Sequence, residues 1–392
     1  MIFANALYRL GDGRRFPYRR QASVWKPTPT VLLTFLTMST ACARVGAADD
    51  GTVLALMERA ADWQLANMEA KPGGERAADG WIKGAFYTGV MALARDSASP
   101  RFHDAMMRMG EANGWKPARR PYHADDHVVS QTYLDLYLQH RDPKMLAPTQ
   151  ERFDWILANR ATTSLSFDKK ANPKSQERWS WCDALFMSPP AWARLWQATG
   201  NAAYLDFAVE EWWVTSDYLY DKEEHLYFRD SSLFEKREPN GRKIFWSRGN
   251  GWVMAGLVRM LELLPADHAS RPRFVQQFRE MADKVVTLQQ ADGFWRASLL
   301  APEHYPMQET SGTGFYTYAL AWGINHGLLD RAKFEPAVRK AWAALASCVN
   351  ADGKLTHVQP VGFTPVTFDT GNSEPFGVGA FLLAGSEVRR LP

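Results

Sequence analysis

Apolar residues recur at the spacing of α-helices along nearly the whole chain from position 51 onward. Residues 53–65 are typical, with apolar side chains on one helical face and charged side chains on the other. The alternation of apolar and polar residues that marks a half-buried strand is hard to find. The pattern therefore predicts an all-α domain.

A second pattern is the recurrence of helices that carry both small and aromatic residues, each preceded by a polar or glycine-rich turn. Their starts are roughly 45 to 65 residues apart, which is room for one inner helix, a return helix and connecting loops. The six predicted starts lie near Trp81, Asp126, Asp183, Gly249, Ser311 and Pro375.

Ordinary amphipathic segments lie between these helices, and residues 202–212 and 274–286 are two examples. Six inner helices surrounded by six outer ones make an (α/α)6 barrel, so we predict this fold, built from six helical hairpins. An irregular helical bundle is the alternative, because it also consists of hairpins. In the barrel, the functional site is expected at the end where the inner helices begin.

The N-terminal segment has the pattern of a secretory signal. Basic residues at 14–26 precede an apolar run at 31–38, which is shorter than the roughly 20 residues that a membrane-spanning helix needs. We expect residues 1–47 to be a signal peptide and N-terminal extension, and residues 48–392 to form one domain. The protein is then exported, periplasmic or extracellular, without stable membrane insertion. Lipid attachment at Cys42 is the alternative, although Ser39 stands where an aliphatic residue is usual.

Composition narrows the classes of partner. The chain has 16 Trp, 13 Tyr and 21 Phe, whose rings can fill a core or stack on sugar rings. Its net charge is only +3 and its charges are interleaved, which argues against a nucleic-acid partner. Cys42, Cys182 and Cys348 lie far apart and indicate neither a disulfide framework nor a zinc knuckle.

Two aspartates are candidates for acid–base chemistry. Asp126 and Asp183 each open a predicted inner helix, so both can project into one cavity. Two carboxyl groups in an apolar cavity can hold different protonation states. General acid–base catalysis at a glycosidic bond requires this difference. The alternative is that each aspartate only caps its helix.

His123 and His127 raise the question of a metal site, but the sequence supplies no further compact group of ligands, so we expect no metal. His127 is then a hydrogen-bonding neighbour of the reactive carboxylate or a substrate contact. The glycine-rich stretches 249–251 and 312–314 lack the preceding strand of a dinucleotide site, so they are interpreted as turns before helices.

The stretch 246–252, WSRGNGW, combines features that suit a ligand. Trp246 and Trp252 offer stacking planes, and Arg248 offers a planar fork that fits a substrate carboxylate. A purely structural turn is the alternative.

Four segments carry a resemblance to a known family. They read DDHVVSQTY at 125–133, WCDALFMSPP at 181–190, FWSRGNGW at 245–252 and ETSGTG at 309–314, the last continuing to AWGIN at 321–325. In this order they resemble glycoside hydrolase family 105, the unsaturated rhamnogalacturonyl hydrolases, akin to the unsaturated glucuronyl hydrolases of family 88. The resemblance covers roughly residues 50–390.

The resemblance implies an exo-acting enzyme that releases Δ4,5-unsaturated uronic acid from the non-reducing end of lyase-generated oligosaccharides by hydrating the C4–C5 double bond. It implies Asp183 as general acid and base and Asp126 as second carboxylate, with Asp125 the less favoured claimant. Neither a metal nor an organic cofactor is implied.

For substrate binding, the resemblance implies that Arg248 and Trp252 contact the unsaturated sugar. Arg229 stands in a stretch where family members carry a histidine. The parent polysaccharide stays open among rhamnogalacturonan, ulvan, a glucuronan and a glycosaminoglycan.

Other functions are compatible with the same barrel. A sugar epimerase or isomerase of this fold relies on paired histidines late in the chain, and comparable motifs are missing around His304, His326 and His357. A polysaccharide lyase or a non-catalytic glycan-binding protein remain the further alternatives.

Overall fold

The structure is a computed structural model that describes residues 50–68 and 74–391. The predicted signal peptide and Cys42 lie outside the described residues. Cys182 and Cys348 are buried and free. Within the described ranges, no helix combines the length and apolar character needed to cross a membrane.

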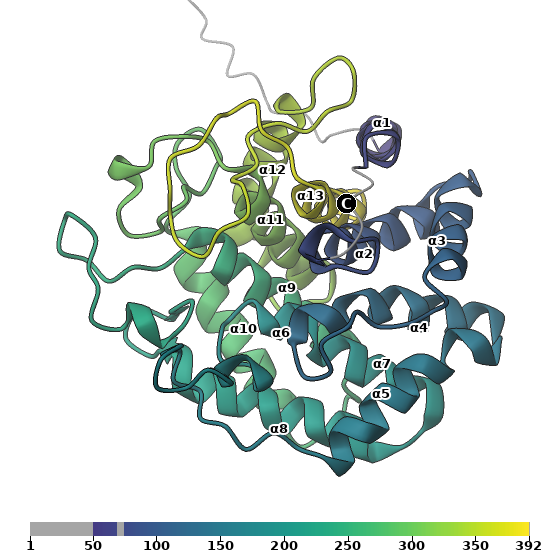
Figure 1. Ribbon diagram of the computed structural model, residues 1–392. Coiled ribbons are helices and arrows are strands. Elements are labelled where there is room, and N and C mark those ends of the chain that lie inside the picture. Colours follow the sequence, from purple (N-terminus) through teal and green to yellow (C-terminus); the bar gives the residue numbers. More distant parts are fainter. Residues whose placement is uncertain (1–49, 69–73, 392) are drawn as a thin grey trace, which may run out of the picture. The chain divides into compact units, whose positions relative to one another are not determined.

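Helices that follow the six predicted starts form a closed inner ring (Figure 1). Each packs against the next, and the last returns to the first, so the ring has no open side. In order around the ring these are α2 (Trp81–Asp96), α4 (Val128–His140), α6 (Ala184–Met187) with α7 (Pro189–Thr199), α9 (Ser247–Leu263), α11 (Thr310–Asn325) and α13 (Pro375–Val388).

The remaining long helices pack outside this ring. They are α1 (Asp50–Ala66), α3 (Arg101–Ala112), α5 (Ala147–Ala158), α8 (Ala202–Leu219), α10 (Arg271–Val286) and α12 (Arg331–Ser347). The described strands are confined to one antiparallel pair, β1 (Tyr220–Asp221) and β2 (Leu226–Tyr227). The prediction of an all-α (α/α)6 barrel is therefore confirmed.

The third inner helix is divided because of its sequence. Pro189 and Pro190 lack backbone N–H groups, so they cannot continue the hydrogen-bond ladder of α6 and instead occupy the first turn of α7. The short helix α6 places Asp183, the residue directly before it, at the end of the barrel.

Small residues let the inner helices approach closely. A Cβ atom on Gly89 of α2 would lie 2.5 Å from the carbonyl oxygen of Gly379 on α13, which is closer than real Cβ contacts allow. A Cβ on Gly256 of α9 would meet the carbonyl oxygen of Leu185 at the same distance. These glycines are needed because backbone faces backbone at both points.

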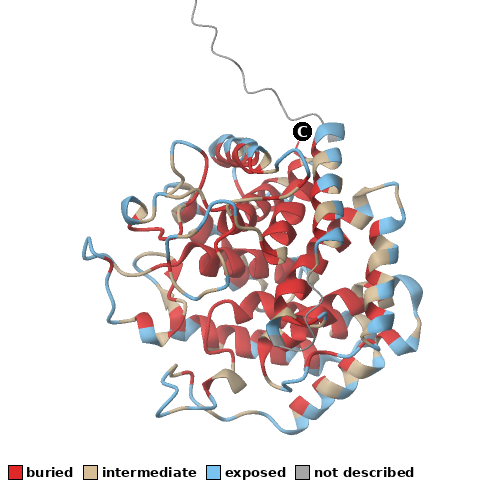
Figure 2. Ribbon diagram, turned by 45° about the horizontal axis from the view of Figure 1, so that its top comes forward, coloured by how far each residue is buried: buried red, intermediate tan, exposed pale blue. Residues whose placement is uncertain are grey.

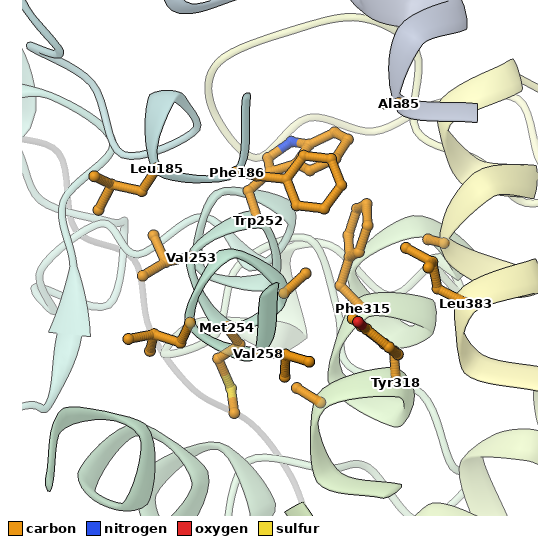
Figure 3. Close-up of a cluster of buried hydrophobic side chains, with 14 of the residues drawn as sticks. Ala85, Leu185, Phe186, Trp252, Val253, Met254, Val258, Phe315, Tyr318 and Leu383 are labelled. Atoms are coloured by element: carbon orange, nitrogen blue, oxygen red, sulfur yellow. The ribbon is translucent and has the colours of Figure 1, made fainter. Parts of the chain in front are cut away.

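The helices of the inner ring consist mostly of buried residues, which are red on the ribbon of Figure 2. At the centre of the inner ring, the side chains of Phe186, Trp252 and Phe315 lie together, between α6, α9 and α11 (Figure 3). The ring centroids of Trp252 and Phe315 are 4.2 Å apart. Trp252 is only 1% exposed, so it belongs to the core, which differs from the sequence expectation that it contacts substrate.

Candidate active site

A cavity of about 460 Å³ opens at the end of the barrel where the inner helices begin, as the sequence predicts. Aromatic, acidic and basic side chains share its wall. The wall includes Arg120, His123, Asp125, Phe167, Lys169, Trp181, Asp183, Arg229, Asp230, Trp246, Arg248 and Phe363.

Asp183 lines this cavity and occupies the N-cap position of α6 without capping the helix through its side chain. Its side chain makes no capping hydrogen bond to α6, although it directly precedes that helix. Its Oδ2 lies 3.6 Å from Nε of Arg229, and the residue is buried. Burial raises the pKa of Asp183, while the charges of Arg229 and Arg248 partly oppose this rise. A carboxyl group with a raised pKa beside a cavity is suited to deliver a proton.

The second carboxyl group on the cavity wall is Asp125. Burial, followed by the charge of Asp183, raises the pKa of Asp125 to about 8. The carboxyl group is therefore mostly protonated at neutral pH, and it can donate a hydrogen bond to a ligand. Together, Asp125 and Asp183 place two acidic groups on one cavity.

Asp126 takes a different place from the one the sequence favoured. It does not line the cavity with Asp183, and its oxygens are bound to Arg120. Nη2 of Arg120 donates to Oδ1 at 2.6 Å, and the backbone N–H of Arg120 donates to Oδ2 at 2.6 Å. The carbonyl oxygen of Asp126 also accepts from the N–H of Ala118 at 3.0 Å. Asp126 thus fastens the segment that presents Asp125.

The two histidines of this segment differ in their surroundings. The ring nitrogens of His127 lie 2.7 Å from Oγ of Ser188 and 2.7 Å from the carbonyl oxygen of Pro121. His127 is therefore satisfied within the protein and lies away from the cavity that Asp183 lines, so it is placed as a structural residue. Burial lowers the pKa of His127 to about 4.

His123, in contrast, lines the cavity, and its ring nitrogens have no hydrogen-bond partner among the described residues. Nδ1 lies 3.8 Å from Oδ2 of Asp125, and the ring packs 4.8 Å from that of Trp181. Burial, helped by the charge of Arg120, lowers the pKa of His123 to about 3. A neutral imidazole offers one donor and one acceptor, which matches a sugar hydroxyl group.

Arg248 and Trp246 line the cavity and hold one of its loops. Nη1 and Nη2 of Arg248 donate to the carbonyl oxygens of Gln359 at 2.7 Å and Pro360 at 2.9 Å. Nε1 of Trp246 donates to Oε1 of Gln359 at 3.0 Å. Arg248 therefore directs its planar fork at main-chain carbonyls, whereas the sequence suggested a substrate carboxylate. Burial lowers the pKa of Arg248 to about 10, so it stays a cation at neutral pH.

Arg229 projects into the cavity between acidic and aromatic neighbours. Its Nη1 donates to Oδ2 of Asp230 at 2.7 Å. Its guanidinium carbon lies 5.0 Å from the ring centroid of Phe167 and 5.8 Å from that of Phe363. With Arg248, it supplies positive charge beside Asp183.

Among the described residues, no group of three or more histidine, cysteine or acidic side chains is arranged to hold a metal ion. The chemistry that the arrangement offers is proton transfer between a ligand and carboxyl groups of the cavity wall, next to two arginines.

The sequence model of glycosyl hydrolase family 88 matches residues 49–392. The chain belongs to this family. It is a glycoside hydrolase, and the resemblance to family 105 and its relative family 88 is confirmed at the level of family 88.

Two relatives described as unsaturated 3S-rhamnoglycuronyl hydrolases match most of this chain. An unsaturated 3S-rhamnoglycuronyl hydrolase of Formosa agariphila is 41% identical over 345 residues, which cover 86% of this chain and 90% of that protein. A protein of the same description from Alteromonas sp. is 36% identical over 355 residues, 86% of each chain. A solved structure of a family 88 glycosyl hydrolase from Bacteroides vulgatus has a TM-score of 0.77 and 31% identity, covering 88% of this chain and 100% of that chain.

In this family 88 enzyme, the structure brings together Asp183, Arg229, Trp246 and Arg248 from the sequence prediction, and leaves Asp126, His127 and Trp252 outside the cavity. It adds residues that sequence reasoning missed or ranked low, namely Asp125, His123, Phe167, Lys169, Trp181 and Phe363. Asp125 and Trp181 lie in the motif segments 125–133 and 181–190, and His123 lies two residues before the first of these, so a signal for them existed. Phe167, Lys169 and Phe363 lie on loops without a periodic pattern.

Proposed function

We propose that this family 88 hydrolase releases Δ4,5-unsaturated uronic acid from the non-reducing end of lyase-generated oligosaccharides by hydrating the C4–C5 double bond. The observation that carries this proposal is the pair of carboxyl groups, buried Asp183 and partly buried Asp125, facing one cavity beside two arginines. Relatives described as unsaturated rhamnoglycuronyl hydrolases support it.

Asp183 performs both proton transfers in this mechanism. Its raised pKa favours the protonated form, which gives its proton to C4 while positive charge develops at C5 and the ring oxygen. Water then adds to C5, and the Asp183 carboxylate accepts the proton of that water. The resulting hemiketal opens the ring, and the hemiacetal formed at C1 releases the remaining saccharide. Asp183 is regenerated in its protonated form.

Asp125 takes the role of second carboxyl group in place of Asp126, because it lines the cavity. Its proton, held at neutral pH by the pKa of about 8, is donated in a hydrogen bond that orients the sugar ring. His123, a neutral donor and acceptor, binds a ring hydroxyl group next to it. Asp126 and Arg120 hold this segment in place.

The carboxylate of the unsaturated sugar lies in the positive potential of Arg229 and Arg248. Because Nη1 and Nη2 of Arg248 both bind a loop, whereas Arg229 binds Asp230 through Nη1, Arg229 is the side chain assigned to direct contact. The cavity rings of Trp181 and Trp246 offer planes for the sugar. The names of the two relatives favour a 3-sulfated rhamnose as the sugar next to the unsaturated uronate.

The test mixes the enzyme with unsaturated oligosaccharides made by lyases. Destruction of the conjugated enoate absorbance, together with release of a 5-keto sugar, supports the proposal. Formation of new enoate absorbance from an intact polysaccharide indicates a lyase instead. Unchanged absorbance with every unsaturated oligosaccharide refutes hydration and favours an epimerase or a non-catalytic binding protein.

A further inference from the structure

The mouth of the active-site cavity carries one positive charge that the described protein does not use. Three cations of the cavity wall have partners: Arg120 binds Asp126, Arg229 binds Asp230, and Arg248 binds loop carbonyls. Lys169 also lines the cavity, is exposed, and forms no ion pair or hydrogen bond through its ammonium group with the described residues. Its charge is therefore available to a ligand.

The loop that presents Lys169 is held in shape by Asn172. Nδ2 of this side chain donates to the carbonyl oxygens of Ser164 at 2.8 Å and Ser166 at 2.9 Å, and its Oδ1 accepts from Thr163. The N–H of Phe167 donates to Oγ of Ser231 at 2.8 Å, two residues after Arg229. These hydrogen bonds hold the loop that places Lys169 at the mouth of the cavity.

A second loop, residues 359–364, contributes an aromatic ring to the same mouth. Phe363 is 61% exposed, which is unusual for a phenylalanine, and it lines the cavity. The loop is fixed because Arg248 binds two of its carbonyls and Nε2 of Gln359 donates to the carbonyl oxygen of Thr364 at 2.9 Å. An exposed ring on a fixed loop is suited to pack against the apolar face of a sugar.

We propose that Lys169 and Phe363 form a sulfate-binding subsite for the sugar that follows the unsaturated uronate. This proposal rests on the proposed function. The Lys169 ammonium binds the sulfate ester, and the Phe363 ring covers the face of the sugar that carries it. An ammonium on a flexible stem suits a tetrahedral oxyanion at the solvent edge, because it needs no fixed bidentate geometry.

The test compares two unsaturated disaccharides that differ only in the sulfate ester on the second sugar. A disaccharide has no third sugar, so no other anion beyond the terminal uronate competes for Lys169. In Lys169→Gln, kcat/KM for the sulfated disaccharide should fall about three- to fivefold, as expected for a solvent-exposed ion pair, and added salt should shrink the difference. The value for the desulfated disaccharide should stay unchanged.

Lys170→Gln is the matched control. Lys170 is the exposed neighbour of Lys169, does not line the cavity, and its replacement makes the same change in net charge. It should leave both disaccharides unaffected. Phe363→Ala should raise KM for both disaccharides, because the ring contacts the sugar whether or not it is sulfated.

Three outcomes overturn the subsite. The first is equal loss on both disaccharides in Lys169→Gln, and the second is an equal effect of Lys170→Gln. The third is a wild-type enzyme that hydrolyses both disaccharides with the same kcat/KM, which leaves the proposed function intact. If neither disaccharide loses its enoate absorbance with the wild-type enzyme, the proposed function fails and the subsite fails with it.

Discussion

Replacing Asp125 by Asn should stabilise the protein while keeping most of its turnover, because Asp125 acts in the proposed mechanism only as a hydrogen-bond donor. Asn keeps the shape of a protonated carboxyl group and its ability to donate a hydrogen bond, but it cannot ionise. The Asp125 side chain is 14% exposed, and burial together with Asp183 raises its pKa from 3.8 to about 8. The effect on stability follows from this shift, and the effect on turnover follows from the donor that Asn retains.

The stability effect has a defined sign. Because the folded pKa is above the unfolded value, the native state binds an extra proton between about pH 4 and pH 8. The contribution of Asp125 to stability is fully present below about pH 4 and is lost as the pH rises through about 8. At pH 7, ionisation of the unfolded side chain opposes folding by about 4 kcal/mol, at about 1.4 kcal/mol per pH unit. Asn removes this cost, less the contacts it loses, so a gain on the order of 1–4 kcal/mol is expected.

The assay is urea unfolding at pH 5, 7 and 8, with kinetics on an unsaturated disaccharide in parallel. The stabilisation of Asp125→Asn over wild type should grow with pH, while kcat stays within about tenfold of the wild-type value because a hydrogen-bond donor is retained. Asp126→Asn is the control of opposite sign, since it weakens the bond to Arg120, which is 43% exposed, and should cost about 1–3 kcal/mol. A pH-independent stability difference in Asp125→Asn, or a loss of turnover as large as that of Asp183→Asn, would refute the reasoning.

Three further substitutions test other parts of the account. Asp183→Asn should lower kcat by about 10²- to 10⁴-fold with KM largely kept, measured by loss of enoate absorbance, because shape is retained and the proton is lost. Arg248→Lys should raise KM at least severalfold, since one ammonium cannot hold both carbonyls of the loop; unchanged kinetics would show that the loop does not depend on this fork. Gly89→Ala should lower the free energy of unfolding by about 1–3 kcal/mol, because the new methyl group meets the Gly379 carbonyl, and an unchanged unfolding midpoint would contradict the close approach.

The fold could be predicted because its signals are repeated. Each inner helix combines small and aromatic residues, and the spacing of the six starts leaves room for one return helix each. Pro189 and Pro190 also indicate the break between α6 and α7 in the sequence. These features are local or periodic, so one sequence suffices to detect them.

The choice between Asp125 and Asp126 could not be made from the sequence. Both lie in the short 3-10 helix η2 (Ala124–His127), where successive residues point about 120° apart. One faces the cavity, and the other binds Arg120. The outcome depends on how the preceding segment folds back, and helical periodicity does not encode that path.

Trp252 shows a second limit of pattern reasoning. It is four residues after Arg248 on α9, so both lie on nearly the same helical face. Four residues advance the chain by about 6 Å along the axis, which carries Trp252 from the cavity floor into the core. Lys169 and Phe363 escaped prediction for another reason, because loop positions carry no periodic signal.

The central claim is that Asp183 delivers a proton to C4 of an unsaturated uronate, and the isotope content of the product tests it most directly. The reaction is run in heavy water and stopped early, and the released keto sugar is analysed by NMR and mass spectrometry. Because C4 lies next to the new ketone, preformed product incubated for the same time corrects for spontaneous exchange. The account predicts one deuterium at C4 above that control. A product without deuterium at C4, or one that keeps its C4–C5 double bond, would contradict it.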